Sequence, residues 1–136
     1  MTKRFAVAAI TLLTMVSLAF ALEPDADRPP VNQVRDFMRK KLAHSQSILE
    51  GLTVDNLEQV ATHAQQISLL SQAAAWQVLQ TPEYSQRSTE FRRAADALTE
   101  AARKRNLDGA TLAYLDVTTK CVSCHKYVRG VRIAGR

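Results

Sequence analysis

The stretch FRRAADALTEAA, residues 91–102, repeats apolar side chains every three or four positions. That spacing matches the 3.6-residue period of an α-helix and places the apolar side chains on one face. The stretch therefore predicts an amphipathic helix, which we expect to end near Arg105. Small side chains on its apolar face allow a neighbouring helix to approach closely. The stripe consists of Phe91, Ala94, Ala95, Leu98, Ala101 and Ala102.

Three further segments carry the same period. The first follows Pro30 and is expected to end at Gly51, and its stripe is Val34, Met38, Leu42, Ser45, Leu49 and Leu52. The second is expected to begin at Asp55, a variant of the capping box with Glu58, and to run as far as Thr81-Pro82. Its stripe is Leu57, Val60, Ala61, Ala64, Ile67, Ser68, Ser71, Ala75, Val78 and Leu79. The last segment is expected to be capped by Asp108 and to run to about Gly130.

These segments predict an all-α fold. No stretch alternates with period two over a useful length, and the 136 residues include only 4 glycines. Four helices joined by short loops favour an antiparallel four-helix bundle.

The first 21 residues have the form of a cleaved signal peptide. Lys3 and Arg4 precede an apolar stretch, and Ala19-Phe20-Ala21 is an A-x-A cleavage site. The alternative is an uncleaved membrane anchor, but the apolar stretch is short for a span and acidic residues follow it at once. The expected mature chain is one domain, with an extended lead-in over 22–30, a helical domain over 31–130 and a frayed tail over 131–136.

The charge of the chain is weak support for a nucleic-acid partner, and we expect none. The formal net charge of +5 falls to +3 once Lys3 and Arg4 are removed. Short basic groups occur at Arg39-Lys40-Lys41 and Arg103-Lys104-Arg105. Both are interpreted as solvated helix faces.

Cys121-Val122-Ser123-Cys124-His125 is a C-x-x-C-H motif, the attachment site of c-type haem. Two thiols three residues apart lie on one side of a helix and can add to the two vinyl groups of one porphyrin. The histidine that follows supplies an imidazole ligand to the iron. Attachment takes place after export, which agrees with the expected signal peptide. Small residues in the second and third helices also leave space for a porphyrin.

Other chemistries of this cysteine pair are less favoured. Cys121 and Cys124 are the only cysteines, and export would permit a disulfide between them. A thioredoxin-type redox site needs a strand-rich βαβ setting, and none is found. Zinc would need further ligands, and besides His125 only His44 and His63 remain.

An exported, all-helical chain of this size with C-x-x-C-H in its last helix resembles the cytochrome c′ family. The resemblance covers the mature chain as architecture, and its specific residues are Cys121, Cys124, His125 and Arg129. It implies one covalent haem c, with thioethers to the two cysteines and iron bound by His125. It also implies that Arg129 lies near the proximal ligand or a haem propionate, and that Arg35 meets a propionate at the mouth of the bundle. A surface position is the alternative for each arginine.

The sixth coordination position of the iron decides the function. Met38 is the only methionine after signal removal, and it lies on the inward stripe of the first helix, which supplies the distal residue in the family. We expect Met38 to ligate the iron, with core packing as the alternative. If Met38 is displaced, Leu42 or Phe37 could shield an open site. His44 and His63 are expected at the surface, and Trp76 could contact a helix, a partner or the haem edge.

The sequence therefore predicts a periplasmic c-type cytochrome that transfers single electrons between Fe(II) and Fe(III). The alternative is a five-coordinate haem protein that binds nitric oxide or carbon monoxide. No hydrolytic constellation or distal His/Arg pair is present, so an enzyme is not expected. Expected partners are redox proteins, and a homodimer through the first two helices is the family-based alternative for the polar face of the second helix.

Overall fold

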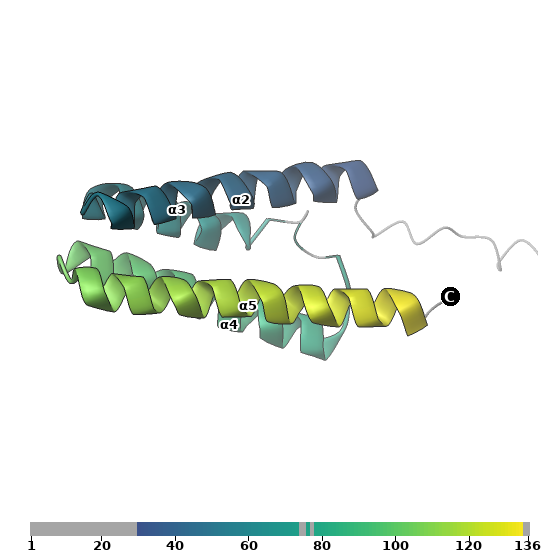
Figure 1. Ribbon diagram of the computed structural model, residues 1–136. Helices are drawn as coiled ribbons and strands as arrows, with labels where there is room; N and C mark the ends of the chain where they lie inside the picture. Colours follow the sequence, from purple (N-terminus) through teal and green to yellow (C-terminus); the bar gives the residue numbers. More distant parts are fainter. Residues whose placement is uncertain (1–29, 74–75, 77, 135–136) are drawn as a thin grey trace, which may run out of the picture.

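The computed structural model describes residues 30–73, 76 and 78–134, and within them it contains four α-helices and no strand (Figure 1). The helices are α2 (Val31–Thr53), α3 (Leu57–Leu70), α4 (Pro82–Arg103) and α5 (Leu107–Ala134). The predicted all-α four-helix bundle is confirmed. The expected signal peptide and the lead-in before Pro30 lie outside the described residues. Among the helices that are described, none is long and apolar enough to cross a membrane.

The bundle consists of two helical hairpins. Short loops join α2 to α3 and α4 to α5, so the helices within each hairpin are antiparallel. The hairpins pack together mainly through α3 and α4, whereas α2 and α5 make few contacts with each other. Figure 1 shows α2 lying opposite α5 across this weak seam.

Asparagines begin two of the helices, in place of the expected aspartates. The side chain of Asn56 accepts a hydrogen bond from the Gln59 amide at 3.1 Å, and that of Asn106 accepts from the Gly109 amide at 2.9 Å. Asp55 lies one residue too early and has a φ of 57°, and Asp108 already lies in the first turn of α5. Asn can fill the cap position as well as Asp, because its carbonyl oxygen also accepts from a free amide.

Helix α4 begins directly after Thr81, which caps it. The Thr81 hydroxyl accepts a hydrogen bond from the Tyr84 amide at 3.2 Å. Pro82 occupies the first helical turn, where its missing N–H is not needed.

Gly51 does not end the first helix. Helix α2 continues to Thr53, and Gly51 is buried where α2 meets α3. A Cβ atom added there would lie 2.9 Å from Cγ2 of Val60. The glycine therefore permits close helix contact rather than a turn.

Helix α3 ends at Leu70, earlier than expected. The Ser71 hydroxyl donates to the Ser68 carbonyl at 2.6 Å, and the chain then leaves the helix. Val78 and Leu79 are buried outside any helix, in a small cluster with Tyr84 and Cys124. Val78 and Leu79 are apolar because they are buried in the connection between α3 and α4. The spacing of apolar residues alone does not distinguish such a connection from a longer helix. Ala75 lies outside the described residues.

Helix α5 extends to Ala134, so the predicted helix end at Gly130 and frayed tail are wrong over 131–134. Val131 packs against the cluster around Val78 and Leu79, which supports the extra turn. Val131 also continues a seven-residue spacing of inward residues that includes Ala110, Val117 and Cys124. Residues 135–136 lie outside the described part.

The inward face of α2 is rotated from the predicted stripe. Leu42 and Leu49 are 58% and 51% exposed, whereas Lys41 and Ile48 are only 8% and 0% exposed. The prediction that Lys41 belongs to a solvated face is therefore wrong, although its neighbours Arg39 and Lys40 are exposed. The Arg103-Lys104-Arg105 group is exposed as predicted. The stripes of α3 up to Ser68, and of α4, point into the core.

Candidate functional site

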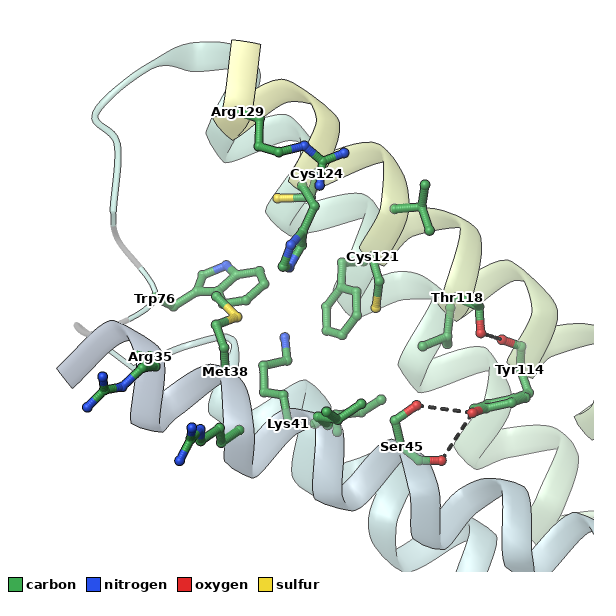
Figure 2. Close-up of a pocket in the computed structure, with 17 residues that line it drawn as sticks. Arg35, Met38, Lys41, Ser45, Trp76, Tyr114, Thr118, Cys121, Cys124 and Arg129 are labelled. Carbon is green, nitrogen blue, oxygen red and sulfur yellow. Dashed lines mark hydrogen bonds between the residues drawn. The ribbon is translucent and has the colours of Figure 1, made fainter. Parts of the chain in front are cut away.

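A cavity of about 810 Å³ opens along the weak seam between α2 and α5 (Figure 2). Its volume lies within the range of about 300–1,000 Å³ typical of small-molecule and cofactor sites. The α2 wall consists of Arg35, Met38, Arg39, Lys41, Leu42 and Ser45. The α5 wall consists of Tyr114, Val117, Thr118, Cys121, Val122, Cys124, His125 and Arg129, and the floor of Ile67, Trp76 and Phe91.

The C-x-x-C-H motif lies on the α5 wall. Cys121 is half-buried, Cys124 is buried, and both are free thiols, so the disulfide alternative is not formed here. Burial raises the pKa of each thiol, and the charge of Lys41 opposes that rise. Both cysteines are therefore neutral thiols at pH 7 and face the same space.

His125 lies on the same wall, at the more exposed mouth of the cavity. Its pKa is lowered, first by partial burial and then by the charges of Arg129 and Lys41. The neutral imidazole, which is the metal-ligating form, is therefore favoured at neutral pH.

The two arginines proposed for propionates both line the mouth of the cavity. Arg129 is exposed and follows His125 by one helical turn. Arg35 is also exposed, with Nε 3.7 Å from a carboxylate oxygen of Asp36, and Figure 2 shows it pointing away from the cavity centre. The structure places both near the candidate site, and their contacts with a cofactor stay predictions.

Met38 lines the α2 wall, half-buried against the core, and its side chain reaches towards Trp76 in Figure 2. Of the two alternative shields, Leu42 also lines the cavity. Phe37 instead is buried beside Trp76, with ring centroids 6.3 Å apart, and does not line the cavity. The proposed role of Phe37 as a shield is thus not supported by its position.

Lys41 is a buried cavity residue that the sequence analysis did not predict. Its Nζ lies 3.6 Å from the ring centroids of both Trp76 and Phe91 and has no hydrogen-bond partner among the described residues. Burial lowers its pKa to about 7, against the opposing effect of Cys121 and Cys124. The spacing could have revealed it, because Lys41 stands midway between Val34 and the fully buried Ile48.

Trp76 forms the floor of the cavity and contacts α4. Its indole N–H donates to the Ser88 hydroxyl at 2.8 Å, and its ring packs on Phe91 with centroids 5.6 Å apart. The Tyr84 hydroxyl donates to the Trp76 carbonyl. Burial raises the pKa of Tyr84 to about 12, so this donor keeps its proton at neutral pH. Trp76 is therefore joined to α4 by two hydrogen bonds and a ring contact.

A polar bridge between the walls limits the cavity at one end. The Tyr114 hydroxyl of α5 donates to the Ser45 carbonyl of α2 at 3.1 Å and lies 3.1 Å from the Ser45 hydroxyl (Figure 2). Beyond this bridge, Ile48 is fully buried in the packed core.

The two other histidines are paired with each other. Nδ1 of His44 lies 2.8 Å from Nδ1 of His63, both rings are half-buried, and neither lines the cavity. Burial, followed by the charge of His63, lowers the pKa of His44. The expectation of plain surface histidines is thus wrong in detail. Over residues 30–73, 76 and 78–134, no three His, Cys, Asp or Glu side chains form a metal-binding group, so the zinc alternative gains no support.

Comparisons of the chain with protein-family models, curated proteins and solved structures give no match.

Proposed function

We propose that this protein is an exported monohaem c-type cytochrome, similar to cytochrome c′, that transfers single electrons. The observation that carries the proposal is that Cys121, Cys124 and His125 line one wall of a mainly apolar cavity of about 810 Å³. Haem iron in such a site supplies one-electron redox chemistry, which the protein tunes through its ligands and by excluding water.

The thiols suit covalent attachment. In the addition, the sulfur of each cysteine bonds to one vinyl carbon and the thiol hydrogen goes to the other, so nothing leaves and no oxidant is consumed. Cys121 and Cys124 lie one turn apart on a rigid helix and both face the cavity. Two such links would fix one edge of the porphyrin to α5 and hold His125 in position as the proximal ligand.

The mouth of the cavity supports electron transfer. Leu42 on α2 and Val122 on α5 both line the cavity and are 58% and 53% exposed. A porphyrin held between these residues would have an edge near the surface, where a redox partner protein can dock. Ile67, Trp76 and Phe91 close the floor of the cavity, which limits access of bulk water from that side.

Binding of nitric oxide or carbon monoxide to a five-coordinate iron is the second candidate. It is favoured by Leu42, an apolar side chain on the α2 wall that cannot ligate. The two functions differ in whether α2 supplies a sixth ligand, for which Met38 is the residue expected from the sequence. The periplasmic location, the redox partners and a homodimer through α2 and α3 are parts of the same proposal.

The test is spectroelectrochemistry of the full chain expressed with cytochrome-maturation machinery. We expect a reversible one-electron couple, low-spin haem in both oxidation states and slow binding of carbon monoxide. A high-spin protein that binds carbon monoxide rapidly would instead establish the gas-binding alternative. A protein with no haem chromophore would contradict both.

A further inference from the structure

The α2 wall carries two side chains with a lone pair suited to iron, the Met38 thioether and the Lys41 amine. A porphyrin held on α5 by Cys121, Cys124 and His125 would lie between α5 and this wall. Figure 2 shows Lys41 extending from α2 into the space between Trp76 and Cys121. A guanidinium group has no lone pair to offer a metal, so the two arginines on this wall are not candidates.

Lys41 is buried in a way that its surroundings do not satisfy. Its side chain is only 8% exposed, and Nζ makes no hydrogen bond or ion pair within the described chain. The Trp76 and Phe91 rings contact Nζ through their faces, which offer a cation only partial compensation for lost water. Burying an amine without a hydrogen-bond partner is unfavourable. A metal ion that accepts the lone pair of Nζ would supply the missing partner.

We propose that Nζ of Lys41 is the sixth ligand of the iron. This inference rests on the proposed haem site and replaces Met38 in that role. On binding, the ammonium group releases one proton to solvent, and the freed lone pair bonds to the metal without any change in oxidation state. The rings of Trp76 and Phe91 then act as positioning groups that hold the lysine stem.

The ionisation of Lys41 agrees with this role. Its pKa of about 7 makes the neutral amine available near physiological pH, unlike that of an exposed lysine. Met38, by contrast, is half-buried against apolar core residues, and core packing fully accounts for it.

The test compares spin states of the purified holoprotein by electron paramagnetic resonance and absorption. Lys41→Leu should convert ferric haem from low-spin to high-spin and open the ferrous iron to carbon monoxide. Lys40→Leu, which removes the neighbouring exposed lysine, and Met38→Leu should both retain the low-spin signal. In Lys41→Ala, added methylamine should restore that signal, which a merely structural role of Lys41 would not produce.

Lys41→Arg keeps a long cationic side chain but has no lone pair to donate, so it should also be high-spin. It provides the comparison if Lys41→Leu matures poorly. The proposal is overturned if the low-spin signal survives every Lys41 substitution, if Met38→Leu alone abolishes it, or if the wild type is high-spin. The intact mass of the protein distinguishes failure of the proposed function from failure of the ligand assignment. A chain lacking haem refutes the proposed function, whereas a haem-loaded chain indifferent to Lys41 refutes only the ligand assignment.

Discussion

The two ends of the bundle are built differently. At the closed end, the loops of both hairpins have the same form, with Asp55 and Arg105 at φ values of 57° and 58° and a capping asparagine immediately after each. The core there is apolar and tightly packed, and consists of Ile48, Leu52, Leu57, Val60, Leu98, Ala102 and Ala110. At the open end, the same four helices surround a cavity lined by two thiols, a buried amine and aromatic rings.

This difference indicates that the closed end stabilises the bundle, whereas the open end has space for a bound molecule. A packed core normally leaves few voids and few unpaired polar groups. The closed end follows that rule, whereas the open end leaves a large cavity and the orphaned Nζ of Lys41. The open end is therefore the part whose folding should depend on a bound cofactor.

The largest expected effect is on the open end as a whole. Replacing both Cys121 and Cys124 by alanine should prevent haem attachment and leave a poorly folded chain, because the cavity then stays unfilled. Far-UV circular dichroism should show a large loss of helix. Ser123→Ala, within the same motif, should mature and fold. A well-folded, haem-free double mutant would show that the open end does not need a cofactor to fold.

The buried amine should account for part of that instability. The pKa of Lys41 falls from 10.5 in the unfolded chain to about 7 in the folded one, which corresponds to at most about 5 kcal/mol at pH 7. Between pH 7 and 10.5 the folded state binds fewer protons, so stability rises with pH.

Lys41→Leu, added to the cysteine double mutant, should therefore restore helix at pH 7 and remove the rise in helicity between pH 7 and 10.5. Circular dichroism against pH measures both effects. Lys40→Leu in the same background is the matched control, since Lys40 is exposed. Equal behaviour of the two lysine variants would show that Lys41 does not destabilise the empty cavity.

The close packing of α2 against α3 can be tested at Gly51, with Gly130 of α5 as the unpacked control. Gly51→Ala should destabilise the holoprotein by about 1–3 kcal/mol, because the new Cβ would lie 2.9 Å from Val60 Cγ2 and 3.1 Å from the Asn56 carbonyl. Gly130→Ala meets nothing within 4 Å and should stabilise α5 by about 0.5–1 kcal/mol. Denaturant unfolding measures both. A neutral Gly51→Ala would mean that the closed end is loosely packed.

The smallest effect is expected at the boundary between the ends. Tyr114→Phe removes the hydroxyl that bridges α5 to Ser45 on α2, which should lower the free energy of unfolding by about 0.5–1.5 kcal/mol. Haem content should be unchanged, because the variant keeps the ring on the cavity wall. A marked loss of haem instead would place Tyr114 among the groups that hold the cofactor.

Much of this arrangement could be predicted from the sequence. The apolar periodicity identified all four helices, and the spacing of Cys121, Cys124 and His125 placed them on one helix, where the structure finds them together. Thr81 and Pro82 marked the start of α4 because their chemistry is local. These short-range predictions were accurate, whereas the local roles expected of Asp55, Asp108 and Gly51 were wrong.

The other errors concern properties set by distant partners. Hydrophobicity favoured Leu42 and Leu49 as the inward residues of α2, but contact with α3 and the seam with α5 turn Lys41 and Ile48 inward instead. The end of α3 was predicted too late, because Val78 and Leu79 are apolar and continue the helical spacing. They are buried in the connection between α3 and α4 instead.

The most direct test is mass spectrometry of the mature protein after trypsin digestion. Cleavage after Lys120 and Lys126 isolates a peptide containing Cys121, Cys124 and His125. The account predicts that this peptide carries the mass of one haem that denaturation does not remove. The same peptide with two free thiols or a disulfide, from a host able to mature c-type cytochromes, would contradict it.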